Sequence, residues 1–340
     1  MKKYGRLLGS SILVGLLIWR VDWRQVASAF VQLDVTYWLL ALGLYLLTQG
    51  VSAVRWQMLG LVLGLGGRWR DYLAYYFVGM FFNLVLPTSV GGDVVRAWYL
   101  AQQRRAADVN WPVNIGRSPL SAAFLSVLAD RVNGLAVLIA VAWGAALCCP
   151  MPLPGWIIAF LAAMGTACLL GLAVLPLLPW LRQWLPLSPR LALLWDGAAL
   201  CLRERRCLLG VTLLSLVVQL ANIVLAWLVG EGLGLPIPPL YYGVLIPLVS
   251  ILTLLPISLN GMGLREAGTV LLLAPLHISS ASAVTLSLLL FAVYAAASLM
   301  GGMVYLFGRS PRFSMEASGN ADPVGGDPDQ GRMRKPSAAA

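Results

Sequence analysis

Charged residues are scarce in this chain, and lysine and histidine are almost absent. Of 340 residues, 11% are charged and 59% are hydrophobic, whereas about 25% of the residues of an ordinary soluble domain are charged. Lysine occurs only at Lys2, Lys3 and Lys335, and His277 is the single histidine. The sequence therefore contains neither the G-x-x-x-x-G-K-[ST] phosphate loop of ATPases nor the H-E-x-x-H motif of zinc proteases. This composition argues against a soluble catalytic domain.

The sequence also contains no motif for binding a metal, a cofactor or a nucleic acid. The five cysteines lie mostly in apolar runs, and none belongs to a metal-spaced Cys-x-x-Cys pair, so we predict no metal site and no cofactor. The net charge of +10 comes from arginines grouped in short segments between apolar runs. That distribution is typical of the positive-inside rule of membrane proteins rather than of a nucleic-acid-binding face.

Four long segments contain no Asp, Glu, Lys or Arg at all. They are residues 132–181, 207–230, 232–264 and 267–308. A helix needs about 20 apolar residues to span a bilayer, so each segment holds at least one span. Because the backbone in hydrocarbon must satisfy its own hydrogen bonds, the sequence predicts an all-α integral membrane protein.

The charge pattern predicts about six full transmembrane helices and two broken, re-entrant hairpins. The spans are a short retained helix over 7–19 and helices over 35–54, 119–149, 156–180, 207–229 and 281–307, with Arg55, Arg68 and Arg70 marking a cytoplasmic loop after the second. We expect one polytopic domain over 1–309 and a disordered cytoplasmic tail over 310–340. Basic residues near both ends predict cytoplasmic termini in the inner (cytoplasmic) membrane of the cell.

The two broken segments cover residues 72–103 and 240–276. Pro87 and Gly91-Gly92 interrupt the first, while Pro256 and Gly261–Gly263 interrupt the second. Each segment forms either a full crossing or a hairpin that enters and leaves on one side. We favour the hairpin for the first, because it keeps the following arginines in the cytoplasm.

The broken segments share the pattern L-P-x-S-x-x-G-x-x-x-R, which ends at Arg96 in the first and at Arg265 in the second. Gln49 matches Gln219 and Gly60 matches Gly230 at nearly the same offset. Chance similarity within an apolar composition is the alternative. Taken as a repeat, the pattern predicts inverted halves over about 35–150 and 205–308. Paired broken segments in inverted halves indicate a transporter site near the membrane midplane.

Three acid–base pairs lie at membrane depth, where a charge costs at least about 2.5 kcal/mol. The pairs are Asp93 with Arg96, Asp130 with Arg131, and Arg265 with Glu266. The first pair has i, i+3 spacing and can meet on one helix face. The other two pairs are adjacent in sequence and point apart, so we expect their members to find other partners. Together the six residues predict a neutral, water-lined cluster.

Arginine suits the recognition of phosphate, because its planar fork donates two parallel hydrogen bonds. Glycine-rich breaks add free N–H groups and positive helix ends. The predicted binding site therefore also includes polar and glycine residues near the breaks, namely Arg55, Asn83, Ser89, Gly91, Gly92, Ser258, Asn260 and Gly261. Other interpretations are a structural lock, a helix cap at Asp93, and an interfacial position for Arg55, Asp130 and Arg131.

Four motifs resemble the flippase-like family that contains the transmembrane region of lysylphosphatidylglycerol synthases. They are Arg55-Trp56, FNLVLPTSVGGDVVR over 82–96, LADRVNG over 128–134 and PISLNGMGLRE over 256–266. The resemblance implies an integral lipid flippase. The synthases also carry a soluble aminoacyl-transferring domain, for which this sequence leaves no room. The resemblance therefore implies a stand-alone member with a different lipid substrate.

The sequence favours a lipid transporter and leaves its enzymatic status open. Its expected substrate is a membrane phospholipid or a polyprenyl-phosphate lipid, bound by Arg96, Arg131 and Arg265. One alternative is a membrane-embedded transferase that uses Asp93 or Asp130 as general base. Another is a non-catalytic partner of a separate synthase or glycosyltransferase.

Overall fold

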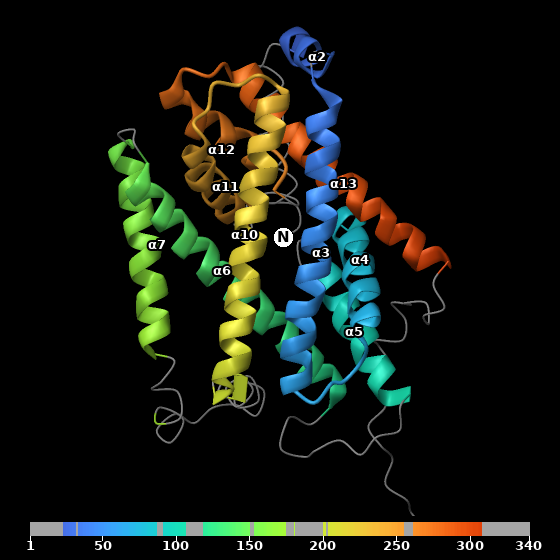
Figure 1. Cartoon of the computed structure of the whole chain (residues 1–340). Coiled ribbons are helices and arrows are strands. Elements are labelled where there is room, and N and C mark those ends of the chain that lie inside the picture. The colour runs from blue at the N-terminus through green and yellow to red at the C-terminus, as the bar shows by residue number, and fades with distance from the viewer. Residues whose placement is uncertain are drawn as a thin grey trace, which may run out of the picture.

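The structure of the chain, a computed structural model, consists of helices joined by turns (Figure 1). It describes residues 23–31, 33–86, 91–106, 118–149, 153–174, 180, 200–201, 203–254 and 261–307, and over these ranges every regular element is a helix. The chain is an all-α membrane protein, as its composition predicts.

The helices are α2 (Trp23–Val31), α3 (Val35–Val62), α4 (Trp69–Val85), α5 (Gly91–Ala106), α6 (Pro119–Cys148), α7 (Gly155–Val174), α10 (Arg205–Gly232), α11 (Pro239–Leu254), α12 (Leu264–Leu273), the 3₁₀ turn η3 (Ala274–Leu276) and α13 (Ser280–Phe307). Four of them, α3, α6, α10 and α13, have 28 to 30 residues and are apolar enough to cross a membrane. A helix of 28 residues is about 42 Å long, which exceeds the roughly 30 Å of a hydrocarbon core.

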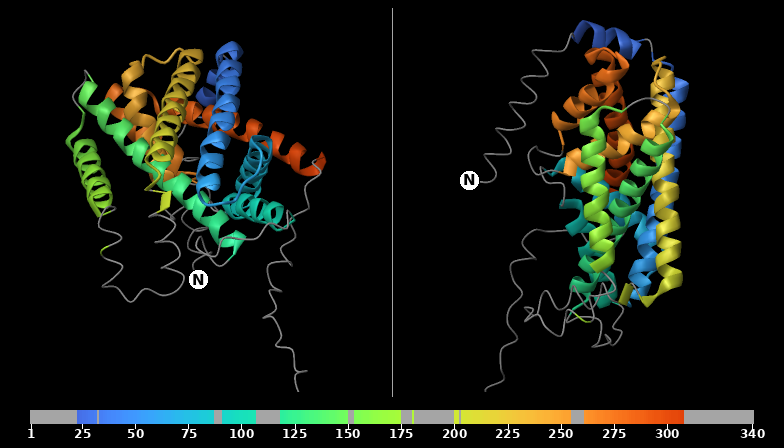
Figure 2. Two further views of the ribbon diagram at one scale, coloured as in Figure 1. Left: turned by 60° about the horizontal axis from the view of Figure 1, so that its bottom comes forward. Right: turned by 90° about the vertical axis from the view of Figure 1, so that its left-hand side faces the viewer.

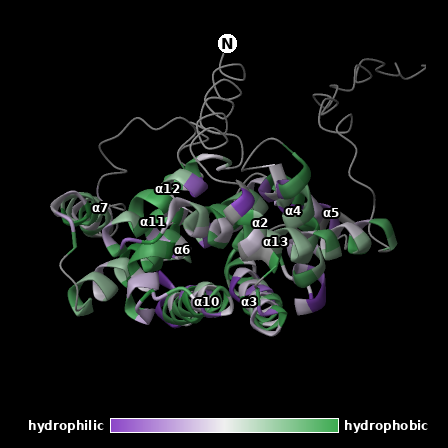
Figure 3. Ribbon diagram, turned by 90° about the horizontal axis from the view of Figure 1, so that it is seen from above, coloured by the Kyte–Doolittle hydropathy of each residue, from purple (hydrophilic) through white to green (hydrophobic). Residues whose placement is uncertain are grey.

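The outer faces of the long helices are apolar. Leu209 and Leu213 of α10 are 65% and 61% exposed, and Leu47 of α3 is 70% exposed. Figure 3, which views the bundle from above, shows hydrophobic residues along α10. Such faces suit contact with lipid chains. The protein is therefore a multi-pass membrane protein.

Helices α3 and α10 lie side by side in opposite directions. Asp34, just before α3, donates its backbone N–H to the carbonyl of Gly232 at the end of α10 (3.0 Å). At the other end, the Cys207 thiol lies 3.7 Å from the carbonyl oxygen of Met58. The two helices form one wall of the molecule (Figures 1 and 2).

Two helical hairpins lie at opposite ends of this wall. In the first hairpin α4 packs against α5, and in the second α11 packs against α12. Figure 1 shows the first hairpin in the lower half of the molecule and the second in the upper half. The arms have 17 and 16 residues in the first and 16 and 10 in the second. Each arm is shorter than the roughly 20 residues of a full span, so the broken segments form hairpins rather than crossings.

The first arm of each hairpin packs on the last long helix of the other half: α4 on α13 and α11 on α6. Small residues allow these contacts. A Cβ atom at Gly301 of α13 would lie 1.9 Å from the carbonyl oxygen of Phe77, and one at Gly243 of α11 would lie 2.7 Å from the Cβ of Ala145. Each hairpin therefore packs on a long helix from a distant part of the chain.

The turns after α3 and α10 match in detail. Leu65 donates to the carbonyl of Gly60 (2.9 Å), as Leu235 does to that of Gly230 (3.0 Å). Tyr72 lies against Gly60, and Tyr242 lies against Gly230, again twelve residues further along. We call each glycine–tyrosine contact a clasp. Helices α3 and α10 run in opposite directions, and their matching residues occupy corresponding positions: Gly60 corresponds to Gly230, and Gln49 to Gln219.

The predicted end of the second span at Arg55 is wrong. Helix α3 continues to Val62, and Arg55 lies inside it, 6% exposed. The prediction assumed that a basic residue marks a membrane boundary, but a buried carboxylate from another helix neutralises this one. The span predicted over 156–180 corresponds to α7, which ends at Val174.

Several predictions fall outside the described residues: the helix over 7–19, the tail over 310–340, and the site residues Ser89, Ser258 and Asn260. The domain boundaries and the sidedness of the termini stay predictions.

Candidate functional site

A buried ion pair joins α3 to α6. Arg55 Nε donates to Asp130 Oδ1 at 2.7 Å, and both side chains are almost fully buried. Arg55 also donates to the hydroxyl of Ser215 in α10 (3.0 Å), which in turn donates to Asn133 of α6 (2.6 Å). Asp130 accepts a second, longer contact from Arg96 Nη2 (3.4 Å). Arg55 and Asp130 therefore tie the α3–α10 wall to α6 and α5.

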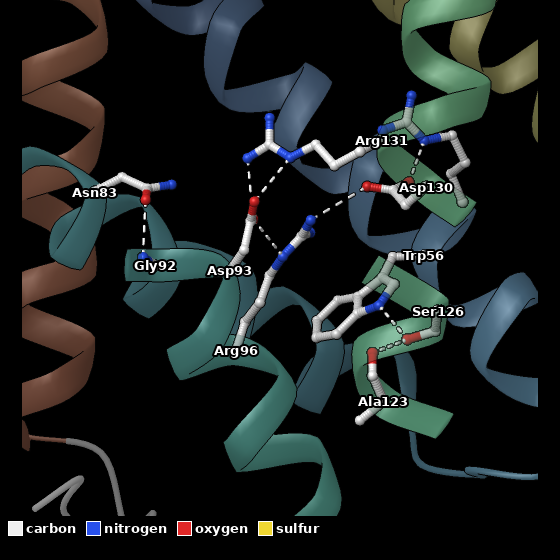
Figure 4. A network of polar contacts seen from close by, with 10 residues as sticks. Trp56, Asn83, Gly92, Asp93, Arg96, Ala123, Ser126, Asp130 and Arg131 are labelled. Atoms are coloured by element: carbon white, nitrogen blue, oxygen red, sulfur yellow. Dashed lines mark hydrogen bonds and ion pairs between the residues drawn. The ribbon is translucent and has the colours of Figure 1, made fainter. Parts of the chain in front are cut away.

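Asp93, in the first turn of α5, lies between two arginines (Figure 4). Arg131 of α6 donates to both of its oxygens at 3.0 Å, and Arg96 Nε lies 3.1 Å from Oδ1. The i, i+3 contact predicted for Asp93 and Arg96 is confirmed. So is the expectation that Asp130 and Arg131 find separate partners. These four residues and Arg55 form one network of two carboxylates and three guanidinium groups.

The guanidinium group of Arg96 lies over two neighbouring aromatic rings. Its Cζ is 4.9 Å from the ring centroids of both Trp56 and Tyr76, a distance at which a cation is attracted to a ring. The Trp56 ring is held by its N–H, which donates to Ser126 at 3.0 Å. Arg96 is 3% exposed, yet its Nη1 has no hydrogen-bond partner within the described parts of the chain. A buried donor of this kind is costly to leave unpaired.

The start of α5 is shaped by Asn83 and two glycines. Asn83 of α4 accepts the N–H of Gly92 at 2.8 Å, so Asn83 has the capping role that we considered for Asp93. A Cβ atom at Gly92 would lie 1.8 Å from the carbonyl oxygen of Gly79. The two hairpin arms therefore touch backbone to backbone here, and Gly91 is the first residue of α5.

The second hairpin carries its own ion pair. Glu266 Oε2 accepts the N–H of Gly263 (2.7 Å), while Oε1 accepts both Arg265 Nε (3.0 Å) and Arg265 Nη2. Arg265 also donates to Ser287 of α13 (3.1 Å) and lies over the ring of Phe291 at 4.5 Å. The expectation that Arg265 and Glu266 find separate partners is wrong, because Glu266 turns back to cap α12 and the long side chain of Arg265 follows it. Gly261 and Gly263 have positive φ angles of 75° and 80°, which glycine adopts without strain.

A cavity of about 350 Å³ lies between the two ion-pair systems. Of the predicted site residues, Asn83, Asp93, Arg96, Arg131 and Arg265 line it. Arg55, Asp130 and Glu266 lie outside its lining and support the arginines that face it. Gly91, Gly92 and Gly261 shape the hairpins. The six predicted ionisable residues thus form two separate systems, and the larger one includes Arg55, which the prediction of a neutral cluster left out.

Several lining residues were not predicted. They are hydroxyl, amide and aromatic side chains from α3, α4, α11, α12 and α13: Tyr45, Gln49, Tyr76, Ser250, Thr253, Thr269, Ser287, Phe291, Tyr294 and Ser298. The spacing of polar residues in the sequence could have indicated this lining. Tyr45 and Gln49 are four residues apart, and Ser287, Tyr294 and Ser298 follow at seven and four, so each set lies on one helix face.

Neither the curated proteins nor the solved structures offer a match to this chain. A family model does match, over residues 5–302, and it describes the lysylphosphatidylglycerol synthase transmembrane region. The match covers both hairpins and every helix that lines the cavity, apart from the last few residues of α13. The chain therefore belongs to the lysylphosphatidylglycerol synthase transmembrane-region family, a family of membrane proteins tied to lipid metabolism or transport.

Proposed function

We propose that this protein moves a phosphate-bearing lipid, a phospholipid or an isoprenoid phosphate, between the two leaflets. The observation that carries the proposal is the cavity that both hairpins line with arginine: Arg96 from the first, Arg265 from the second, and Arg131 from the adjoining α6. Intramembrane arginines that face a cavity mark a pathway for a polar or charged substrate.

The arginines suit phosphate in number and position. A guanidinium group binds phosphate oxygens through parallel N–H donors, and each hydrogen bond to a charged group contributes about 1.5–3 kcal/mol. Two buried nitrogens of Arg96, Nε and Nη1, donate no hydrogen bond within the described residues, and the guanidinium group lies over the rings of Trp56 and Tyr76. A phosphate oxygen in the cavity would satisfy such a donor after a shift of the side chains that bury it.

The size of the cavity supports a lipid whose chains stay outside. A volume of about 350 Å³ lies at the small end of the usual range of about 300–1,000 Å³ for ligand pockets. It accommodates a head-group and not a pair of acyl chains. The apolar outer faces of α3 and α10 leave those chains in contact with lipid.

The hairpins supply a means of alternating access. They occupy opposite ends of the molecule (Figure 1), and each contributes an arginine to the same cavity. Movement of one hairpin would open the cavity towards one membrane face while the other hairpin closes the opposite face, as in other transporters with inverted halves.

The transferase alternative is less well supported. A general base must be free to take a proton from the substrate, but Asp93 and Asp130 each contact two arginines. The partner alternative has no feature of the described structure in its favour.

The test is lipid exchange in proteoliposomes that contain the full chain. Wild-type protein is expected to move fluorescent phospholipid or polyprenyl phosphate between leaflets, and Arg96→Ala and Arg265→Ala are each expected to slow that exchange about 10- to 100-fold. Arg70→Ala is the matched control, because Arg70 is exposed at the start of α4 and lies outside the cavity lining. Wild-type exchange no faster than that of empty liposomes, with or without a proton gradient, would refute the proposal.

A further inference from the structure

The cavity presents three arginines and a single carboxylate, Asp93, among its described lining residues. That carboxylate is already engaged. Oδ1 contacts Arg96 and Arg131, and Oδ2 accepts from Arg131. A positively charged head-group would therefore have to compete with two guanidinium groups for Asp93.

The two carboxylates behind the lining are engaged as well. Asp130 contacts Arg55 through one oxygen and Arg96 through the other. Glu266 binds Arg265 through Oε1 and the Gly263 N–H through Oε2. The seven ionised groups of the two systems comprise four arginines and three carboxylates, so they carry a net charge of +1.

Aromatic faces are the second means by which proteins bind an ammonium group, and several rings here already have such a contact. Arg96 covers Trp56 and Tyr76, and Arg265 covers Phe291. The rings of Tyr45 and Tyr294 pack on each other, with centroids 4.9 Å apart. The protein's own arginines thus already lie against rings that could otherwise bind choline or ethanolamine.

The remaining polar lining is uncharged. Ser250, Thr253, Ser298 and Gln49 contribute hydroxyl and amide groups, which exchange hydrogen bonds with alcohols as readily as with water. This part of the cavity lining suits a glycerol or sugar hydroxyl attached to the phosphate.

We propose that the cavity selects anionic lipid head-groups that lack an amine, such as a phosphodiester of glycerol or a bare polyprenyl phosphate, and disfavours ethanolamine and aminoacylated head-groups. This inference rests on the proposed function and narrows its substrate class. The phosphodiester of a glycerol lipid carries one negative charge, which balances the net +1 of the ion-pair systems, and a phosphate monoester carries up to two. An added ammonium group is repelled by the arginines and meets no carboxylate free of arginine among the described residues.

The test compares lipids with identical labelled acyl chains and different head-groups in proteoliposomes of the full chain. Phosphatidylglycerol, or polyprenyl phosphate in a parallel series, is expected to cross at least about ten times faster than phosphatidylethanolamine or lysylphosphatidylglycerol. Arg131→Gln removes the bidentate partner of Asp93 and brings the net charge to zero, so the preference is expected to fall at least about threefold. Arg70→Gln, with the same loss of charge at an exposed position, is expected to keep the wild-type ratio.

The outcomes separate this inference from the proposed function. Equal or faster transport of the amine-bearing lipids by folded wild-type protein overturns the head-group selection and leaves lipid transport intact. Exchange of none of the lipids overturns both. Uptake of free glycerol 3-phosphate, measured in the same vesicles, would show that the site serves a water-soluble phosphate ester, and it too overturns selection of a lipid.

Discussion

Arg55 of α3 and Asp130 of α6, 75 residues apart in sequence, meet at 2.7 Å inside the bundle. Without Arg55, Asp130 would keep only its longer contact with Arg96 (3.4 Å), and a buried polar group that loses a hydrogen-bond partner costs about 1–3 kcal/mol. Arg55→Met is therefore expected to destabilise the protein by about that amount in detergent unfolding experiments. The double variant Arg55→Met/Asp130→Leu is expected to be more stable than Arg55→Met. Equal stability of the single and double variants would argue against a buried, charged pair.

Substitution of Arg96 by lysine tests whether charge alone suffices in the cavity. Lysine keeps the positive charge but loses the planar fork and its contact with the faces of Trp56 and Tyr76. Arg96→Lys is expected to remain folded by size-exclusion chromatography and to transport at least about tenfold more slowly. Arg70→Lys is the control at an exposed position. Wild-type rates in Arg96→Lys would show that the fork is dispensable.

The backbone contact between the arms of the first hairpin can be tested with alanine. Gly92→Ala places a methyl group 1.8 Å from the Gly79 carbonyl oxygen, so α4 and α5 must separate. The expected destabilisation is about 1–3 kcal/mol, with loss of lipid exchange. Gly43→Ala in α3 is the control, because a Cβ there has no neighbour within 4 Å. It is expected to be neutral or stabilising by up to about 1 kcal/mol.

The two glycine–tyrosine clasps predict that a substitution of the tyrosine partly restores the stability lost by substitution of its glycine. A Cβ at Gly60 would lie 2.1 Å from the Tyr72 hydroxyl, and one at Gly230 would lie 1.7 Å from that of Tyr242. Gly60→Ala is expected to be partly rescued by Tyr72→Phe, and Gly230→Ala by Tyr242→Phe, since each second change removes the nearest atom. Thermal unfolding of the four single and two double variants measures both couplings. Additive effects in either cycle would contradict the geometry of that clasp.

The helical class and the broken segments could be predicted because they depend on local composition. Uncharged runs identify helices in lipid, and Pro–Gly interruptions identify the breaks. The contact between Asp93 and Arg96 followed from helical spacing. These features need no knowledge of how distant segments pack.

Features that depend on long-range packing were missed or misread. Arg55 was taken as a boundary because its partner lies 75 residues away. Trp56 and Tyr76 were not assigned to the site, since nothing in the sequence places them around Arg96. The pairing of Arg265 with Glu266 was misjudged because side-chain direction along an ideal helix ignores the cap that Glu266 makes at Gly263.

Helix α7 contributes no residue to the lining of the cavity, but it determines at which end of the bundle the next long helix begins. The segment from α3 to α6 starts and finishes at the same membrane face, because the first hairpin does not cross. A directly fused second copy would therefore have the same orientation as the first. Helix α7 follows α6 in the sequence and lies at the left edge of Figure 1, and it returns the chain to the end of the bundle at which α10 begins. Two such segments lie in opposite orientations, as the predicted inverted halves require, when an odd number of crossings separates them.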